Sequence, residues 1–145
     1  MEVKCQSGGS KPVVRISSVD QLSPQLPCGY LIVYTLASQA CDEPGSLSLN
    51  LLVTQIRDNL SVASFASRER FEDLLYMAGY LTCEEYDDIR FSVVSIKSYQ
   101  LIGGFPRIDT SGLIAGVEAV SYSIRLEACN SFQRKPQWWP PNYEY

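Results

Sequence analysis

The clearest pattern of hydrophobic and polar positions in the chain lies between residues 120 and 128. Apolar side chains alternate there with polar ones: Val120, Tyr122, Ile124, Leu126 and Ala128 against Ser121, Ser123, Arg125 and Glu127. A period of two predicts a strand with one buried and one exposed face. Residues 89–102 carry apolar side chains on both faces, which predicts a more central strand or one with a bulge. We expect these two strands, joined by a Gly/Pro-rich connection, to supply a sheet that helices cover.

Shorter patterns predict the remaining elements. Apolar pieces at residues 1–5 and 13–16 predict short strands, and the run from residue 29 to residue 36 predicts a buried central strand. Helices are expected at residues 48–60 and 67–78, with apolar side chains facing inward at Leu49, Leu52, Val53, Ile56, Leu60, Phe71, Leu74, Leu75 and Ala78. Short helices are expected after Ser18 and at a capping box over residues 82–85.

These elements predict the fold class. Apolar strands alternate with amphipathic helices, which favours an α/β or α+β domain with a mixed β-sheet flanked by helices. With 145 residues, of which 46% are hydrophobic, the chain is expected to form one domain with its own core. We place that domain at residues 1–136 and a tail rich in aromatic residues and proline at residues 137–145.

Composition indicates the cellular location of the protein, the state of its cysteines and the kinds of catalysis that it can perform. No apolar run approaches the roughly 20 residues that span a bilayer, and the N-terminus lacks the pattern of a signal peptide. We therefore expect a soluble, cytoplasmic protein without a membrane partner. The five cysteines are scattered and form no C-x-x-C pair, so we expect free thiols. Because the chain contains no histidine, Ser–His catalysis, Cys–His catalysis and most catalytic zinc sites are excluded.

Charge argues against a strongly basic binding surface. The formal net charge is −4, and an acidic chain is a poor candidate for unaided binding to phosphate backbones. Basic residues cluster near the start at Lys4, Lys11 and Arg15, either as a local patch or as ordinary solvated charges. An acidic group at residues 84–88 is interpreted either as a metal site or as charges that suit the N-terminus of a short helix.

The tail contains two adjacent tryptophans, Trp138 and Trp139. Side chains of this size are rarely left free in water, so they either pack back on the domain or cover a protein partner. We take them as candidate interface residues.

The first motif with chemical meaning is Glu2-Val3-Lys4. On a strand, the spacing E-x-K places the acid and the lysine on the same face. In a nuclease this arrangement lets the carboxylate hold Mg²⁺ while the ammonium group orients or activates the attacking water. The motif alone is short enough to occur often by chance.

The succession of several segments is more specific. Glu2-Val-Lys4 is followed by residues 14–22, the apolar strand at residues 30–36, Tyr86-Asp87 before a strand, Gly104-Phe-Pro-Arg107 and residues 120–126. In this order the segments resemble the PD-(D/E)XK-motif proteins of the restriction-endonuclease-like superfamily, in particular an uncharacterised group found near restriction and mobile-element genes. The resemblance covers most of the chain.

The resemblance implies a set of site residues. Glu2 and Lys4 match the E-x-K of the family, with Glu2 as the metal ligand, and Gln21 matches the glutamine that some members carry on the following helix. The family's second acid, an Asp on a strand upstream of E-x-K, has no counterpart in this sequence. We therefore expect a truncated restriction-endonuclease-like core that corresponds to a C-terminal half.

Two functions follow from this comparison. The first is a binding or interaction module that needs no cofactor and has no catalytic activity. The alternative is a Mg²⁺-dependent DNA nuclease of restriction type, with the missing acidic ligand supplied in trans. Since a truncated core leaves a sheet edge uncovered, we also expect a homodimer or a larger homo-oligomer.

Overall fold

The structure is a computed structural model that describes residues 1–23, 29–40, 43–109, 112–117 and 119–136. Contacts between Cα atoms divide the chain into two compact units. The first contains Met1–Ala37 and Val93–Tyr145, and the second contains Ser38–Ser92.

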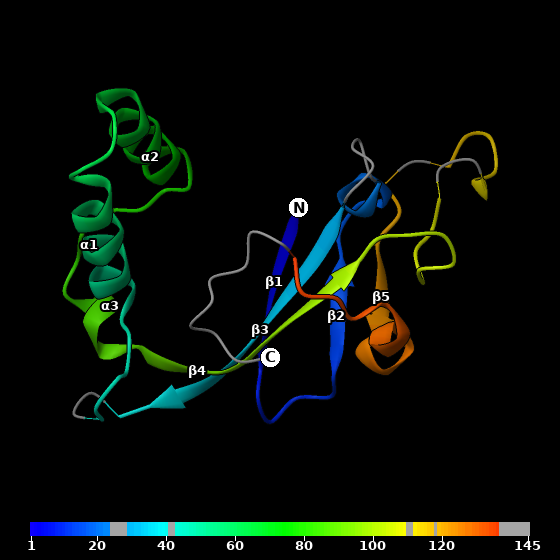
Figure 1. Cartoon of the computed structure of the whole chain (residues 1–145), viewed down its shortest axis with the longest axis horizontal. Coiled ribbons are helices and arrows are strands. Elements are labelled where there is room, and N and C mark those ends of the chain that lie inside the picture. The colour runs from blue at the N-terminus through cyan, green and yellow to red at the C-terminus, as the bar shows by residue number, and fades with distance from the viewer. Residues whose placement is uncertain (24–28, 41–42, 110–111, 118, 137–145) are drawn as a thin grey trace. The chain divides into compact units, whose positions relative to one another are not determined.

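A three-stranded sheet forms the framework of the first unit (Figure 1). It contains β1 (Glu2–Ser7), β3 (Tyr30–Gln39) and β4 (Arg90–Gln100) in the order β1-β3-β4. Strands β1 and β3 are parallel, with Glu2 beside Leu31 and Lys4 beside Val33, whereas the arrows of β3 and β4 run in opposite directions in Figure 1. The predicted mixed sheet with helices is confirmed.

The first unit also contains a two-stranded antiparallel ribbon. It pairs β2 (Val13–Ile16) with β5 (Tyr122–Arg125). Two 3₁₀ helices, η1 (Val19–Leu22) and η3 (Leu126–Phe132), follow these strands in the chain. The predicted pairing of the strand at residues 89–102 with the strand at residues 120–128 is therefore wrong, since β4 and β5 belong to different sheets.

The predicted strand at residues 120–128 is also too long. Its partner β2 has only four residues, so the pairing of the two strands ends at Arg125, followed by one further bond from the Leu126 N–H to the Pro12 carbonyl at 2.8 Å. The chain then enters η3, where Leu126 and Cys129 are three residues apart and both are buried. The three-residue period of a 3₁₀ helix puts these two side chains on the same side, which the alternating pattern concealed.

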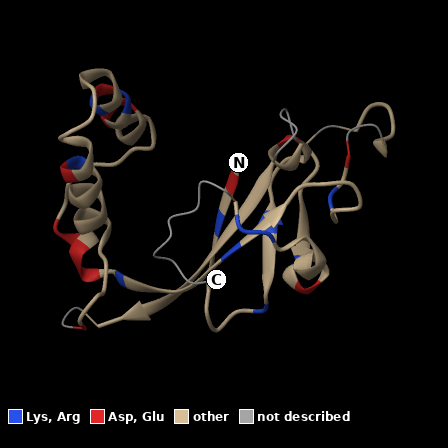
Figure 2. Ribbon diagram, viewed as in Figure 1, with Lys and Arg blue, Asp and Glu red and all other residues tan. Residues whose placement is uncertain are grey.

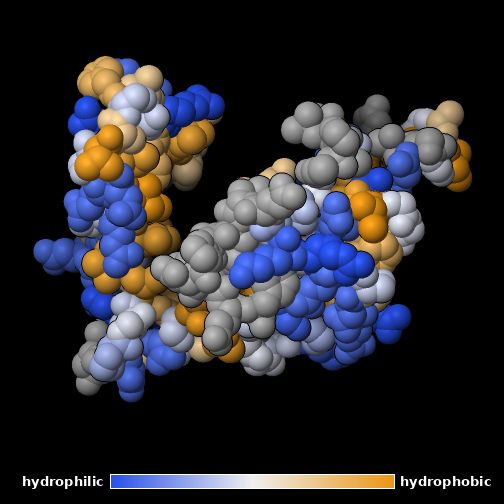
Figure 3. Space-filling view, viewed as in Figure 1, coloured by the Kyte–Doolittle hydropathy of each residue, from blue (hydrophilic) through white to orange (hydrophobic). Residues whose placement is uncertain are grey.

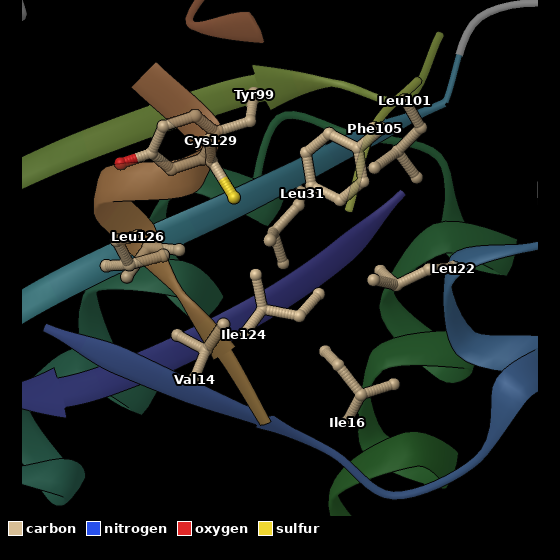
Figure 4. Packing of buried hydrophobic residues seen from close by; sticks show 11 residues of the cluster. Val14, Ile16, Leu22, Leu31, Tyr99, Leu101, Phe105, Ile124, Leu126 and Cys129 are labelled. Atoms are coloured by element: carbon tan, nitrogen blue, oxygen red, sulfur yellow. The ribbon is translucent and has the colours of Figure 1, made fainter. Parts of the chain in front are cut away.

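The hydrophobic core of the first unit lies between the ribbon and one face of the sheet (Figure 4). In the close-up, Leu31 of β3 points toward Ile124 of the ribbon, and the ring of Tyr99 of β4 extends toward η3, which carries Cys129. The buried members of this cluster are Val14, Ile16, Leu22, Leu31, Val33, Tyr99, Leu101, Phe105, Ile124, Leu126 and Cys129. This core includes residues of β3 and η1, and β1 is held beside it by its pairing with β3.

The second unit contains three helices: α1 (Leu49–Leu60), α2 (Phe65–Met77) and α3 (Glu85–Asp88). Ser48 and Ser64 cap the first two, because each hydroxyl accepts a hydrogen bond from a backbone N–H of the first turn. The helices predicted at residues 48–60 and 67–78 are confirmed, with α2 starting two residues earlier. The predicted capping box is wrong: α3 begins after Glu84, which makes no side-chain capping hydrogen bond.

The predicted inward-facing stripes of these helices are mostly not buried. Val53 is the one buried residue of α1, and none of the residues of α2 is buried. Leu49, Leu52 and Leu74 are exposed, and hydrophobic residues are visible along both helices in Figure 3. Two long helices and a single short one are too few to surround an apolar stripe, which normally needs a further layer.

Among the described residues, every helix is too short or too polar to serve as a membrane span. Cys5, Cys83 and Cys129 are free thiols, as predicted, whereas Cys28 and Cys41 lie outside the described residues.

Candidate functional site

Strand β1 places its polar side chains against the core side of the sheet. Glu2, Lys4 and Gln6 alternate with the exposed Val3 and Cys5, so the three polar residues share one face. Register with β3 puts Glu2 and Lys4 beside two buried residues, Leu31 and Val33. As a result the two charged side chains are only 22% and 19% exposed, respectively.

The candidate residues Glu2, Lys4 and Gln21 come together in one cluster, which we call the Lys4 cluster. Lys4 Nζ lies 3.0 Å from Glu2 Oε1 and donates a hydrogen bond to Gln21 Oε1 at 3.1 Å. The backbone N–H of Ser17 donates to the same Gln21 oxygen at 2.9 Å. With two donors on one oxygen, the Gln21 amide has a fixed orientation, and the lysine is held between an acid and an amide.

Helix η1 presents Gln21 to β1 because its start and end are both fixed. At its N-terminus, the Ser18 hydroxyl accepts a hydrogen bond from the backbone N–H of Asp20. At its C-terminus, Leu22 is fully buried and its carbonyl accepts a hydrogen bond from Arg107 Nη1 at 3.0 Å. Gln21 therefore lies between two fixed points of η1: the Ser18 cap at its start and the hydrogen bond from Arg107 at its end, which we call the Arg107 clamp.

Arg107 was not selected from the sequence as a site residue. It follows Phe105, which is 5% exposed and belongs to the core, and Gly104, whose φ of +83° allows the sharp turn that brings Phe105 inward. The Gly-Phe-Pro-Arg segment thus anchors one side of η1. Only the resemblance pointed to this segment, because the contact joins residues 85 positions apart.

Gln6 is a second residue that the sequence reasoning missed. Its Nε2 donates to Thr35 Oγ1 at 3.0 Å, while its buried Oε1 has no hydrogen-bond partner among the residues that the structure describes. A buried polar oxygen without a partner is costly and is often found where water or a ligand binds. The alternation Glu2, Lys4, Gln6 was the available signal, since it continues the same polar face by one step.

The Lys4 cluster supplies one carboxylate for a metal ion. Mg²⁺ in phosphate-processing sites uses one or two carboxylates together with substrate phosphates. Glu2 alone is at the lower limit of this range, and its Oε1 is already ion-paired with Lys4. Within the described part of the chain, no three His, Cys, Asp or Glu side chains group closely enough to hold a metal ion. Among the described residues, Glu2 is therefore the carboxylate that the Lys4 cluster offers to a metal ion.

The acidic residues at positions 84–88 have a different role. Asp87 accepts hydrogen bonds from the hydroxyl of Ser48 and from Asn50 Nδ2, the latter at 2.8 Å. Asn50 also donates to the carbonyl of Cys83 and accepts from the hydroxyl of Tyr80, each at 2.8 Å. These bonds tie α3 to the start of α1. The hydrogen bonds from Ser48 and Asn50 lower the pKa of Asp87 below its usual value.

The two candidate interface residues, Trp138 and Trp139, lie outside the described residues.

Comparison with known proteins agrees with the resemblance. Residues 1–127 match the family described as "Putative PD-(D/E)XK family member, (DUF4420)". No curated protein and no solved structure gives a significant match. Since the match covers most of the 145 residues, the chain belongs to this PD-(D/E)XK family.

Proposed function

We propose that the chain is a binding module of the PD-(D/E)XK family that contacts the phosphate backbone of DNA at the Lys4 cluster without cleaving it. The observation that carries the proposal is the position of Lys4 Nζ, which is held between Glu2 and Gln21; among the described residues, Glu2 supplies the one carboxylate paired with it. A fixed ammonium group suits a phosphate oxygen, and one carboxylate is the smallest number with which Mg²⁺ is held in phosphate-processing sites, so the described residues favour binding over hydrolysis.

The distribution of charge supports this proposal. The first unit has eight basic and six acidic residues, a net charge of +2, and the second has four basic and ten acidic residues, a net charge of −6. The overall charge of −4 is therefore the sum of a basic unit, which contains the candidate site, and a strongly acidic one. The first unit by itself carries a positive net charge, so its overall electrostatics do not oppose phosphate binding.

Basic side chains are also present on the outer face of the ribbon. Arg15 of β2 and Arg125 of β5 are both exposed, opposite Ser123 and Val13 in the register. Lys and Arg residues are visible on the ribbon and the sheet of this unit in Figure 2. Long-range attraction to phosphates from such residues adds to binding and is reduced by salt.

Fluorescence anisotropy with a short labelled DNA duplex in EDTA tests the proposal. We expect Lys4→Ala to weaken binding by roughly tenfold, equivalent to about 1.4 kcal/mol. Glu2→Gln should strengthen binding, because it removes a negative charge next to Lys4. Opposite effects at two positions of one ion pair distinguish phosphate contact from simple disruption of the strand.

Matched arginine variants complete this experiment. Arg15→Ala should weaken binding and reduce its salt dependence, whereas Arg70→Ala, an exposed arginine in α2 of the acidic unit, should change neither. Equal affinities for the wild-type chain, Lys4→Ala and Glu2→Gln would refute the proposal.

A second candidate function is the Mg²⁺-dependent nuclease with an acid supplied in trans. One observation favours it: of the described strands, only β3 pairs with β1, so one edge of β1 is open to a further strand. An acid on an added strand would lie about 4.8 Å from the β1 backbone. If a second copy supplies that acid, DNA cleavage should rise with the square of protein concentration.

The same open edge supports the predicted homodimer or larger homo-oligomer, which remains a prediction. An exposed strand edge is an association site, and two-fold dimers are the commonest solution. A partner that binds through Trp138 and Trp139 also remains a prediction. Light scattering tests the dimer: a mass near 16.2 kDa that does not change with concentration would contradict it.

A further inference from the structure

One side of α2 in the second unit carries two exposed aromatic residues. Phe65, the first residue of the helix, is 67% exposed, and Tyr76, near its end, is 81% exposed. Eleven residues make about three helical turns, so both side chains lie on the same side of α2, about 16 Å apart along its axis. The half-buried residues of α2, Phe71 and Leu75, lie on another side, where Phe71 lines a hollow together with Leu60 of α1. The two exposed aromatic rings are therefore separate from the packing between the helices.

An open groove lies along the same side of α2 and begins at Phe65. It has a volume of about 470 Å³ and is lined by Phe65, Arg68, Glu69, Glu72 and Asp73. Side chains spaced i, i+3, i+4, i+7 and i+8 share one face of a helix. The Arg68 guanidinium lies 6.0 Å from the centroid of the Phe65 ring, so it is engaged at the start of the groove.

The groove carries more negative than positive charge, since three of its lining residues are acidic and one is basic. Glu72 forms a two-point ion pair with Arg57 of α1, with N–O distances of 2.8 Å and 2.9 Å. Glu69 and Asp73 are exposed and one helical turn apart, so their carboxylates repel each other. A cation placed between them would relieve this repulsion. The net charge of −6 of the whole unit adds to the attraction for a cation.

These features indicate the kind of partner that fits. The carboxylates would repel a nucleic acid or an anionic membrane, and a second copy of this face would place acid against acid. A helix with basic and apolar side chains matches the face in both charge and spacing, because helices dock through side chains that repeat along one face. The 13 residues of α2 extend about 20 Å, a length that a partner helix of four turns would cover.

We propose that this side of α2 is a docking surface for a basic amphipathic helix of a partner protein. Lysine or arginine side chains of the partner lie between Glu69 and Asp73, and two of its large apolar side chains pack on Phe65 and Tyr76. Exposed aromatic residues are typical anchors of such interfaces. The docking surface belongs to the acidic unit and uses no residue of the Lys4 cluster, so it does not depend on DNA binding.

Fluorescence anisotropy with a labelled synthetic peptide tests the docking surface in the full chain. The peptide is a helix of about 16 residues, with two leucines about three turns apart and lysines on the same side between them. We expect a scrambled peptide of the same composition to bind roughly tenfold more weakly, because its leucines and lysines no longer share a face. Equal affinities for the two peptides would overturn the proposal, since general attraction between charges would then explain the binding.

Charge-reversed variants locate the contact on the unit. Glu69→Lys and Asp73→Lys should each weaken binding of the peptide by roughly tenfold, and Tyr76→Ser should also weaken it. Asp58→Lys makes the same change of charge at an exposed position of α1 and should have little effect. Circular dichroism checks that all four variants keep their helices. A loss in Asp58→Lys as large as that in Glu69→Lys would overturn the proposal.

Light scattering of the chain without peptide tests a second copy as the occupant of the same surface. The measured mass should be the same for the wild-type chain and Tyr76→Ser. A wild-type dimer that Tyr76→Ser dissociates would assign this side of α2 to a second copy and would overturn the proposal.

Discussion

At the scale of single residues, the Lys4 cluster combines a feature that sequence predicts with one that it does not. The spacing of Glu2 and Lys4 predicts a shared face, and the ion pair at 3.0 Å has that geometry. The contact with Gln21 spans 17 positions and depends on the packing of η1, so spacing could not reveal it. Only the family resemblance selected Gln21.

Asp87 is expected to stabilise the second unit in a pH-dependent way. Hydrogen bonds from Ser48 and Asn50 depress its pKa in the folded state, so its contribution is present above the usual aspartate pKa of about 3.9. That contribution is lost as the pH falls through the lower folded-state pKa. Urea unfolding at several pH values should show Asp87→Asn less stable than the wild-type chain at neutral pH, with the difference shrinking in acid.

Asp73→Asn is the control for this prediction, since it removes an exposed negative charge from α2 of the same unit. A difference between wild type and Asp87→Asn that stays constant from neutral to strongly acidic pH would contradict the assigned role.

The cysteines are expected to differ widely in reactivity. Burial raises the pKa of the Cys129 thiol to about 11, and its side chain is fully buried, whereas Cys5 is exposed on β1. Because the thiolate is the reactive form, alkylation of the native protein should modify Cys5 rapidly and Cys129 last. Mass spectrometry of timed samples checks this order, and early modification of Cys129 would show that η3 does not bury it.

At the scale of elements, the pattern of the sequence predicted the positions of most helices and strands. It did not predict the lengths of all these elements or the elements that they contact. Helices α1 and α2 were predicted because their apolar positions repeat at helical steps. The burial of those stripes requires a partner layer, which a periodic pattern cannot supply. The strand predicted over residues 120–128 stopped early because its partner β2 is short, a fact about pairing and not about the local pattern.

The clamp between Arg107 and η1 is a testable element-scale contact. Arg107→Ala removes the donor to the carbonyl of the fully buried Leu22 and should lower the free energy of unfolding by about 1–3 kcal/mol. Arg125→Ala, an exposed arginine on β5, should change it by less than about 0.5 kcal/mol. Urea unfolding measures both values, and equal losses would contradict the clamp.

Arg107 should also influence DNA binding through Gln21. We expect Arg107→Ala to weaken binding less than Lys4→Ala does, because it acts by positioning η1 and not by touching a phosphate. Arg107→Lys should restore part of the loss, since a lysine can still donate to the Leu22 carbonyl. Anisotropy with the same duplex measures both, and a loss as large as that of Lys4→Ala would contradict a positioning role.

At the scale of the whole molecule, the division into two units changes how composition is interpreted. The net charge of the chain predicted weak interaction with phosphates, but the unit that carries the Lys4 cluster is basic and the helical unit is strongly acidic. Charge along the sequence could not predict this separation, because the basic unit is built from both ends of the chain. Family and fold class were accessible from sequence, whereas the charge of each unit required the structure.

Plasmid integrity at saturated binding tests whether the Lys4 cluster binds DNA without cleaving it. Supercoiled plasmid is incubated with the protein and Mg²⁺ or Mn²⁺ at a concentration at which anisotropy shows saturated DNA. We expect full binding with no nicked or linear plasmid. Metal-dependent cleavage that disappears in EDTA, in Glu2→Gln and in Lys4→Ala would contradict it and establish the cluster as an active nuclease site.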